Sequence, residues 1–131
     1  MAFYVDTSAL VKLVVAEAQT TALQTWITTT TAELVSSDLA RTELLRAVRR
    51  GASDQVVQAR AVLDSLSLLT VSTTVFESAG HLNPAVLRTL DALHLASALS
   101  LGDDLEGLVT YDERLAEAAR SHGIAVVAPF L

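Results

Sequence analysis

Two aspartates follow short apolar runs of the kind that form buried strands. Asp6 comes directly after residues 3–5, and Asp112 comes directly after residues 108–111. In open sheets of parallel strands, ligands bind beyond the carboxyl ends of the strands. Both carboxylates are therefore expected at that edge of a sheet, although each is also suited to capping the helix that follows it.

Two further acids lie inside helical segments. Glu43 precedes Arg46 by three residues, a spacing that also permits an ordinary surface ion pair on a helix. Asp91 begins an apolar helical stretch with no lysine or arginine between Arg88 and Arg114. A carboxylate entering a buried helix without a local cation is costly unless another group compensates for its charge. A divalent metal at the sheet edge would provide that compensation.

The four acids form one site only if the fold brings them together, which their spacing along the chain does not decide. Mg²⁺ and Mn²⁺ prefer hard oxygen ligands such as carboxylates, with water and substrate phosphate completing the shell. Two such ions about 4 Å apart can activate a water and stabilise the leaving oxygen of a phosphodiester. Metal-dependent hydrolysis is therefore the chemistry that the acids would support together: Asp6, Glu43, Asp91 and Asp112.

The elements that must position these acids alternate between apolar, strand-like runs and helical segments. Strands are expected over residues 3–5, 34–36, 68–71, 108–111 and 124–128. Helices are expected over 9–16, 19–28, 37–50, 53–65, from 74 onward, 89–101 and 112–122, with Gly51, Gly102 and Gly123 at helix ends. This alternation predicts a single α/β domain over residues 1–131, with a central parallel sheet of roughly five strands covered on both faces.

Composition limits the class of protein more than it limits the partner. The 131 residues are 51% apolar and include no cysteine, which excludes intrinsic disorder, disulfide scaffolds and thiolate zinc sites. No apolar run is long enough to cross a bilayer, so a small, soluble, cytoplasmic protein with no membrane partner is expected. The net charge of −6 argues against a nucleic-acid partner, but arginines cluster between residues 41 and 60. Net charge therefore does not decide the partner.

Four segments together resemble the PIN domain, and specifically the VapC-type toxins of bacterial and archaeal toxin–antitoxin pairs. They occur in the family's order and span nearly the whole chain. They are Tyr-Val-Asp-Thr-Ser-Ala-Leu at 4–10, Arg-Thr-Glu-Leu-Leu-Arg-Ala at 41–47, Leu-Asp-Ala-Leu-His-Leu-Ala-Ser-Ala-Leu at 90–99, and Val-Thr-Tyr-Asp-Glu-Arg-Leu at 109–115. The first segment alone is a weak pattern, whereas all four in this order are specific to the family.

This resemblance implies a three-layer α/β/α PIN-like fold whose acid cluster binds Mg²⁺ or Mn²⁺ and cleaves RNA with a metal-activated water. Carried over to this chain, the catalytic acids are Asp6, Glu43, Asp91 and Asp112. Asp6 and Asp91 are then the principal metal ligands. The hydroxyl groups that match the family's supporting positions, where they orient a carboxylate or a water, belong to Ser8 and Thr110.

The same resemblance implies a substrate and a partner. The expected substrate is a structured RNA, such as a tRNA or a ribosomal RNA loop, and the expected partner is a small VapB-like antitoxin. A homodimer is expected, alone or in a hetero-oligomer with the antitoxin. Four arginines fit contacts with an RNA backbone, and they fit a solvated helix face or an acidic stretch of antitoxin equally well: Arg41, Arg46, Arg49 and Arg50.

One histidine lies close to the expected site along the chain. His94 follows Asp91 by one helical turn, on the same face of the helix. Such a histidine is more often a hydrogen-bonded core residue than a support for a metal site, and the core role is the expectation. Because it shares the face of Asp91, both roles stay open.

Other functions of an acidic α/β domain fit the sequence less well. A phosphoacceptor regulatory module needs adjacent acids after its first strand and a lysine after its last, but Asp6 stands alone and the only lysine is Lys12. A haloacid-dehalogenase-type phosphatase needs Asp-x-Asp, and Ser8 occupies the second of those positions. A PIN-like fold that acts only as a non-catalytic binding scaffold stays open, although the presence of all four acids counts against it.

Overall fold

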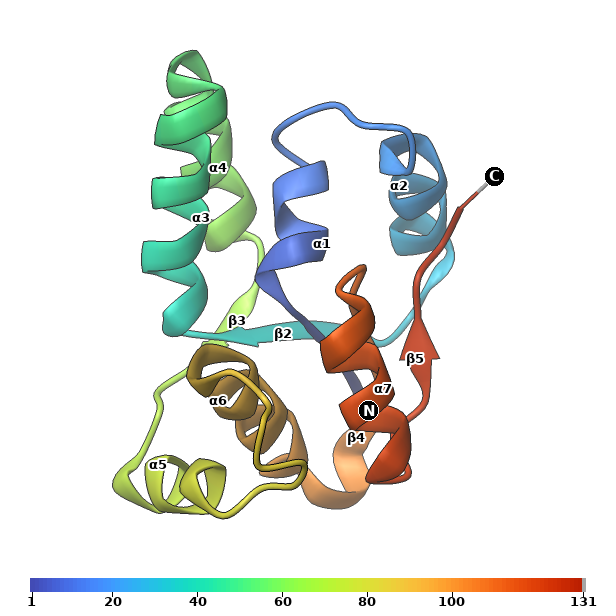
Figure 1. Ribbon diagram of the computed structural model, residues 1–131. Helices are drawn as coiled ribbons and strands as arrows, with labels where there is room; N and C mark the ends of the chain where they lie inside the picture. The colour runs from blue at the N-terminus through green and yellow to red at the C-terminus, as the bar shows by residue number, and fades with distance from the viewer. Residues whose placement is uncertain (131) are drawn as a thin grey trace.

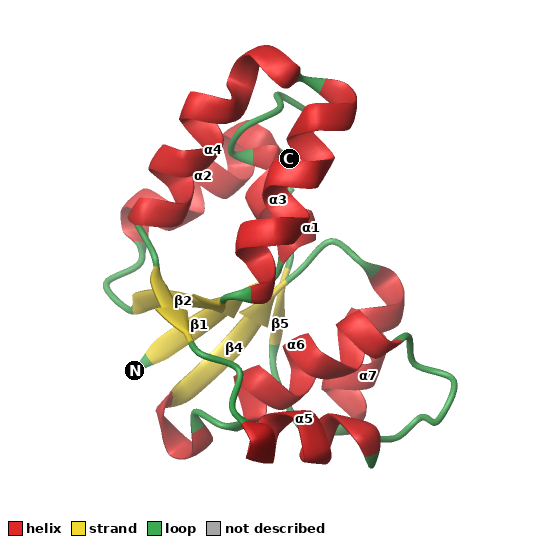
Figure 2. Cartoon of the chain, turned by 90° about the vertical axis from the view of Figure 1, so that its left-hand side faces the viewer, coloured by secondary structure: helices red, strands yellow, loops and turns green. Residues whose placement is uncertain are grey.

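A five-stranded sheet lies between two layers of helices in the computed structural model, which describes residues 1–130 (Figures 1 and 2). All strands are parallel, in the order β3-β2-β1-β4-β5. They are β1 (Ala2–Val5), β2 (Glu33–Ser37), β3 (Ser67–Leu69), β4 (Leu105–Val109) and β5 (Val126–Val127). The helices are α1 (Thr7–Lys12), α2 (Thr20–Thr29), α3 (Leu39–Gly51), α4 (Val56–Asp64), α5 (Thr73–Gly80), α6 (Thr89–Leu99) and α7 (Glu113–Ser121), with short 3₁₀ turns at Ser53–Gln55 and Gly102–Asp104.

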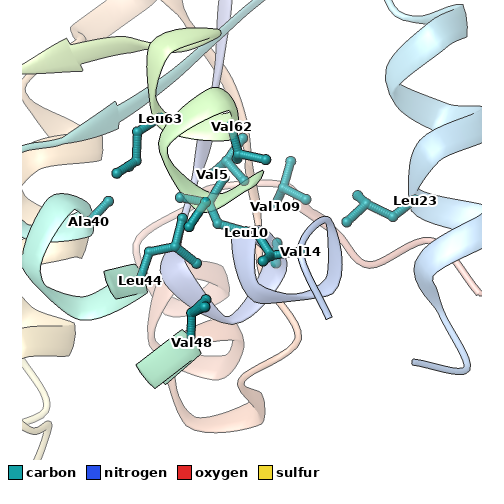
Figure 3. Packing of buried hydrophobic residues seen from close by; sticks show 12 residues of the cluster. Val5, Leu10, Val14, Leu23, Ala40, Leu44, Val48, Val62, Leu63 and Val109 are labelled. Atoms are coloured by element: carbon teal, nitrogen blue, oxygen red, sulfur yellow. The ribbon is translucent and has the colours of Figure 1, made fainter. Parts of the chain in front are cut away.

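Each face of the sheet has its own apolar core, because successive side chains of a strand point to opposite faces. Val5 packs with Leu10 and Leu44 in the core beneath α1–α4 (Figure 3). Its neighbour Tyr4 packs on the other side with Leu95 and Leu115, beneath α6 and α7. The predicted three-layer α/β/α architecture is confirmed.

The sheet changes winding direction at β1. From this first strand the chain builds β2 and β3 on one side, and it then returns to build β4 and β5 on the other side. At such a switch point the loops leaving adjacent strands separate, and the crevice between them commonly binds ligands. Asp6 directly follows β1, whereas Thr110 and Asp112 follow β4. The topology therefore brings three of the predicted site residues to one crevice.

The fourth strand lies earlier than expected, over Leu105–Val109 rather than 108–111. The start of this strand was missed because Gly107 weakens the strand pattern of the sequence. Close packing requires that glycine: a Cβ there would lie 3.0 Å from the Ala125 carbonyl oxygen and 3.1 Å from the Phe3 ring. Because β4 ends at Val109, Thr110 belongs to the loop that follows the strand and not to the strand itself.

Helix boundaries agree with expectation at some ends and differ at others. Gly102 and Gly123 follow α6 and α7 with φ of 58° and 78°, the left-handed conformation expected beyond a helix end. α1 ends at Lys12 rather than at residue 16. α5 begins earlier than expected because Ser72 caps it, its Oγ accepting from the Val75 amide at 3.2 Å. Within residues 1–130, no helix combines the length and apolarity needed to cross a membrane.

Candidate active site

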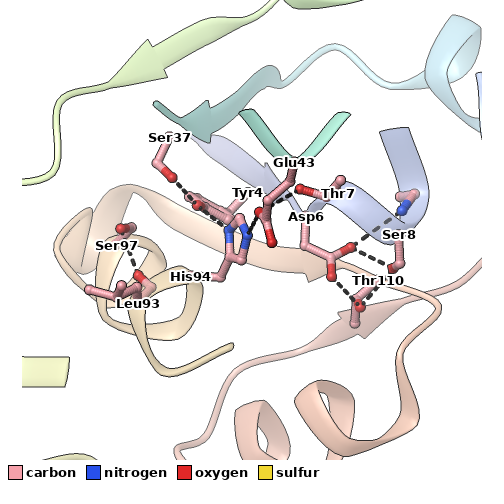
Figure 4. Close-up of polar contacts among 11 residues, drawn as sticks. Tyr4, Asp6, Thr7, Ser8, Ser37, Glu43, Leu93, His94, Ser97 and Thr110 are labelled. Carbon is pink, nitrogen blue, oxygen red and sulfur yellow. Dashed lines mark hydrogen bonds and ion pairs between the residues drawn. The ribbon is translucent and has the colours of Figure 1, made fainter. Parts of the chain in front are cut away.

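Asp6 lies at the base of the crevice, where β1 ends and α1 begins. Its side chain is the N-cap of α1 and accepts from the Ala9 amide at 3.3 Å. Ser8 Oγ donates to Asp6 Oδ1 at 2.7 Å, and Thr110 Oγ1 donates to Oδ2 at 3.0 Å (Figure 4). Only 4% of Asp6 is exposed, and this burial raises its pKa to about 6, although these hydrogen bonds and the nearby His94 act in the opposite direction.

The two hydroxyls beside Asp6 also tie β1 to the loop after β4. Ser8 Oγ accepts from the Tyr111 amide at 2.9 Å, and Thr110 Oγ1 accepts from the Asp112 amide at 3.0 Å. Each hydroxyl thus donates to the carboxylate while accepting from a backbone amide. Ser8 and Thr110 therefore hold the Asp6 carboxylate in one orientation.

Glu43 reaches the crevice from the middle of α3. Its Oε1 accepts from Thr7 Oγ1 at 2.8 Å and lies 2.5 Å from His94 Nε2 (Figure 4). The surface pair with Arg46 that the spacing permits is not among the ion pairs of residues 1–130. Burial alone would raise the pKa of Glu43, but the hydrogen bond and positive charge of His94, with the Thr7 hydroxyl, outweigh it and lower that pKa.

His94 is the residue that connects this carboxylate to the core. The histidine is 2% exposed, as expected for a core residue, and its Nδ1 lies 2.8 Å from Tyr4 Oη. Tyr4 is fully buried and its hydroxyl lies 2.9 Å from Ser37 Oγ, at the end of β2. Burial raises the pKa of Tyr4 to about 12, despite the serine hydroxyls around it. The sequence indicated only that His94 shares a helix face with Asp91.

Asp91 and Asp112 form the more open side of the site. Asp91 lies in the first turn of α6 and is half-buried. Its pKa is raised by burial, then by the charge of Asp112 and less by that of Glu43, while His94 and Arg88 oppose the rise. Asp91 is therefore close enough to both Asp112 and Glu43 to be repelled by their charges.

Asp112 also performs the capping role that the sequence left open. Its Oδ1 accepts from the amides of Arg114 and Leu115 at 2.9 and 3.0 Å, at the start of α7. Capping uses Oδ1, and Asp112 still contributes to the negative potential at Asp91. Within residues 1–130, no three acidic or histidine side chains are already arranged as a metal cage. The acids lie at one edge of the sheet, without a preformed coordination shell among the described residues.

A groove of about 750 Å³ leads away from the acids along α3. Thr7 and Glu43 line it at the acid end, Arg46 and Arg50 line it further along α3, and Phe76 of α5 lies across from them. The exposed side chains of Arg46, Arg49 and Arg50 also border a smaller depression of about 200 Å³.

The fourth predicted arginine has a different environment. Arg41 Nε pairs with Asp38 Oδ1 at 3.0 Å, and both side chains are exposed. Arg41 is absent from the residues lining the two depressions, which contain the other three arginines. The arginines predicted to contact RNA thus divide into a group of three near the groove and one in a surface ion pair.

Comparison with known proteins gives a consistent family. Residues 3–121 match the model of the PIN domain. The chain is 46% identical to Ribonuclease VapC46 of Mycobacterium tuberculosis (strain ATCC 25618 / H37Rv) over 98% of both chains. It is 42% identical to Ribonuclease VapC47 of Mycobacterium tuberculosis (strain CDC 1551 / Oshkosh) over 96% of both chains.

Solved structures show the same fold. Mycobacterium tuberculosis VapC20, described as a Sarcin-Ricin loop cleaving toxin, gives a TM-score of 0.78 at 18% identity, over 97% of this chain and 99% of that one. A toxin-antitoxin complex from Klebsiella pneumoniae gives 0.74 at 19% identity, over 99% of this chain and 98% of that one. The chain therefore belongs to the PIN domain family, among its VapC-type members.

Proposed function

We propose that this protein is a Mg²⁺- or Mn²⁺-dependent endoribonuclease that acts as the toxin of a toxin–antitoxin pair. The observation that carries the proposal is the gathering of carboxylates at the crevice beyond β1 and β4, where burial raises the pKa values of Asp6 and Asp91 and the charges of Asp112 and Glu43 raise that of Asp91 further. Two curated relatives at 42% and 46% identity are named ribonucleases, which supports RNA as the substrate.

The donor set fits a hard divalent cation. Asp6 and Asp91 would hold it, since both are carboxylates whose charged form is poorly compensated by the protein itself. Glu43 and Asp112 would complete the cluster directly or through water. When bound, the cation would activate a water for attack on a phosphodiester and stabilise the leaving oxygen.

The protein's own residues would orient this site and the RNA. Ser8 and Thr110 hold the Asp6 carboxylate between two hydroxyl donors. Arg46, Arg49 and Arg50 lie where an RNA strand leaving the acids along the groove would present its phosphates. A structured RNA, such as a tRNA or ribosomal RNA loop, is the proposed substrate, supported by the described target of the VapC20 structure.

A VapB-like antitoxin is the proposed partner. Two of the similar structures are toxin–antitoxin assemblies: the complex from Klebsiella pneumoniae and VapBC2 from Rickettsia felis, which was solved with a promoter DNA fragment and gives a TM-score of 0.69 at 14% identity. We propose a homodimer that also assembles with the antitoxin in the cytoplasm. A non-catalytic PIN-like scaffold is the alternative that the following experiment separates.

Cleavage of total cellular RNA by the purified protein tests the proposal. Discrete fragments are expected with Mg²⁺ or Mn²⁺ and none with EDTA or with Asp91→Ala, while Asp103→Ala, an exposed acid in the turn after α6, should cleave normally. Calcium should bind but support cleavage poorly, because it favours more ligands and looser geometry.

Two results would contradict the metal mechanism: undiminished cleavage by a folded Asp91→Ala protein, or full activity with calcium. A folded wild-type protein that neither cleaves RNA nor binds Mn²⁺ would favour the scaffold alternative.

The arginine assignment is tested by the salt dependence of RNA binding. In EDTA, which prevents cleavage, Arg46→Ala and Arg50→Ala should each reduce the slope of log affinity against log salt by about 0.7 for a single-stranded contact. Arg41→Ala should change it less, because Arg41 already pairs with Asp38. Arg120→Ala on α7 provides an exposed control. Equal effects from all four variants would indicate non-specific attraction and not a path along α3.

A further inference from the structure

We propose that His94, braced by Tyr4 and Ser37, is a positioning residue that fixes the Glu43 carboxylate for the reaction. The inference rests on the proposed nuclease function and extends it to residues on the core side of the acids. Three hydrogen-bonding contacts form an unbroken chain from Ser37 through Tyr4 and His94 to Glu43, and a fourth joins Glu43 to Thr7 (Figure 4).

The direction of the contact with Glu43 follows from the donors available. At neutral pH a glutamate side chain is ordinarily a carboxylate, which can only accept hydrogen bonds, and Glu43 Oε1 already accepts from Thr7. The facing His94 Nε2 must then carry the proton. On the other side of the ring, Nδ1 either accepts the Tyr4 hydroxyl proton or donates to Tyr4 Oη while Tyr4 donates to Ser37. Nε2–H donates to Glu43 in both arrangements, so the contact does not depend on the charge of the ring.

The two donors act on one oxygen of Glu43. Thr7 Oγ1 and His94 Nε2 both contact Oε1, whereas no donor within residues 1–130 contacts Oε2. The Glu43 side chain is about one quarter exposed, with a relative accessibility of 24%, against 3% for His94. One oxygen is thus anchored by the protein, and the other stays available to a water, a cation or the substrate.

The anchoring chain is rigid because its inner members are enclosed. Tyr4 is on the central strand two residues before Asp6, and its ring meets the His94 ring edge-on, with centroids 5.8 Å apart and an interplanar angle of 69°. Glutamate has several rotatable bonds, so holding its carboxylate in one place before the substrate arrives lowers the entropic cost of reaching the reactive geometry. His94 therefore couples the position of Glu43 to the strand that leads into Asp6.

A kinetic comparison separates positioning from a purely structural role. His94→Leu should lower kcat by roughly 10- to 100-fold, the range typical of groups that orient a metal-site ligand, with KM changed less than about threefold. His94→Gln, whose amide can donate to Glu43, should recover at least half of the lost kcat on a logarithmic scale. Tyr4→Phe should lower kcat by a smaller factor in the wild-type protein and by none in His94→Leu.

Controls keep these effects specific. His81→Gln removes an exposed histidine at the end of α5 and should leave both constants unchanged. Circular dichroism and the melting temperature show whether each variant is folded at the assay temperature. A folded His94→Leu protein with kcat within twofold of wild type, or a His94→Gln protein no better than His94→Leu, would overturn the positioning role.

A second measurement does not require activity and so separates failure of this inference from failure of the proposed function. In ¹H–¹⁵N NMR spectra, the His94 Nε2 proton should be directly observable and protected from exchange, and Glu43→Gln should shift its resonance. A crystal structure of His94→Leu should show the Glu43 carboxylate displaced from Thr7 or in several rotamers. An unprotonated Nε2, or an unmoved Glu43, would refute the inference even if RNA cleavage were confirmed. If wild type cleaves no RNA but both structural results are as expected, the anchoring is confirmed and only the nuclease proposal fails.

Discussion

Asp6, the N-cap of α1, and Glu43, on the neighbouring helix α3, reach into one crevice. Each accepts a hydrogen bond from a hydroxyl group, yet their pKa values move in opposite directions. Asp6 has only neutral donors, Ser8, Thr110 and the Ala9 amide, and burial raises its pKa to about 6. Glu43 shares its oxygen with His94, and its pKa is lowered. At Asp6 the hydroxyl and amide donors and the more distant His94 do not offset nearly complete burial, whereas at half-buried Glu43 the direct contact with His94, together with Thr7, does.

The comparison assigns different tasks to the two acids. Asp6 is well oriented but electrostatically unsatisfied, which is the condition that a bound cation relieves. Glu43 is already compensated from inside the protein and gains less from a cation. The largest contrast between Asp6 and Glu43 is therefore expected in metal binding.

Metal affinity gives the largest expected effect. Asp6→Asn should weaken Mn²⁺ binding by more than about 100-fold, because it removes a proposed direct ligand, while Glu43→Gln should weaken it by about 10- to 100-fold, the range seen for supporting groups. Isothermal titration calorimetry at pH 7.5 measures both. Equal losses would show that the two carboxylates ligate alike and that Asp6 and Glu43 do not have different tasks.

Stability against pH gives the next effect. The pKa of Asp6 rises from 3.8 to about 6 on folding, so the folded protein retains a proton between these values that the unfolded chain releases. Asp6 therefore makes the metal-free protein progressively less stable as the pH rises from about 4 to about 6, by roughly 3 kcal/mol in total.

Asp6→Asn removes this titration. It also lowers the free energy of unfolding by about 1 kcal/mol, because an amide nitrogen cannot accept the hydrogen bond that Thr110 donates to Asp6. Urea unfolding should thus find the variant more stable than wild type by about 2 kcal/mol at pH 7.5, and less stable below pH 4. Glu43→Gln, which loses a charged partner of His94, should be less stable than wild type at pH 7.5. A destabilised Asp6→Asn protein at pH 7.5 would show that burial of Asp6 is compensated after all.

The site's location was predictable from the sequence, but its inner support was not. Asp6 and Asp112 follow apolar runs, and alternation of strands and helices implies parallel strands whose carboxyl ends share an edge, so local patterns suffice to place them. The contact of Tyr4 with His94 joins residues 90 positions apart and depends on which face of β1 Tyr4 occupies. A tyrosine in an apolar strand gives no sign that its hydroxyl has a histidine partner.

The partners of Glu43 were likewise not predictable from the local sequence. Its local spacing favoured a surface pair with Arg46, whereas packing of α3 against α1 turns the carboxylate toward Thr7 and His94. The family resemblance, and not the spacing, predicted its place among the acids. Gly107 similarly concealed the start of β4, because the close approach of Phe3 and Ala125 that requires a glycine exists only in the folded protein.

The smallest expected effect is the change in stability on removing the hydroxyl group that contacts Asp6 or the one that contacts Glu43. Ser8→Ala deletes a donor to Asp6 and the acceptor of the Tyr111 amide, so it should lower the metal-free stability at pH 7.5 by about 1–2 kcal/mol. Thr7→Val, a substitution of similar shape, deletes only a donor to Glu43, whose Oε1 keeps its contact with His94. Its cost should stay near or below about 1 kcal/mol.

Adding saturating Mn²⁺ sharpens this last comparison. The cation would stabilise ionised Asp6 in place of the lost Ser8 donor, so the stability deficit of Ser8→Ala should shrink in Mn²⁺ while that of Thr7→Val stays nearly constant. Urea denaturation with and without Mn²⁺ measures both deficits at one pH. If the Thr7→Val deficit shrinks more, then Glu43 and not Asp6 is the carboxylate that depends on the cation, and the tasks assigned to these two residues must be exchanged.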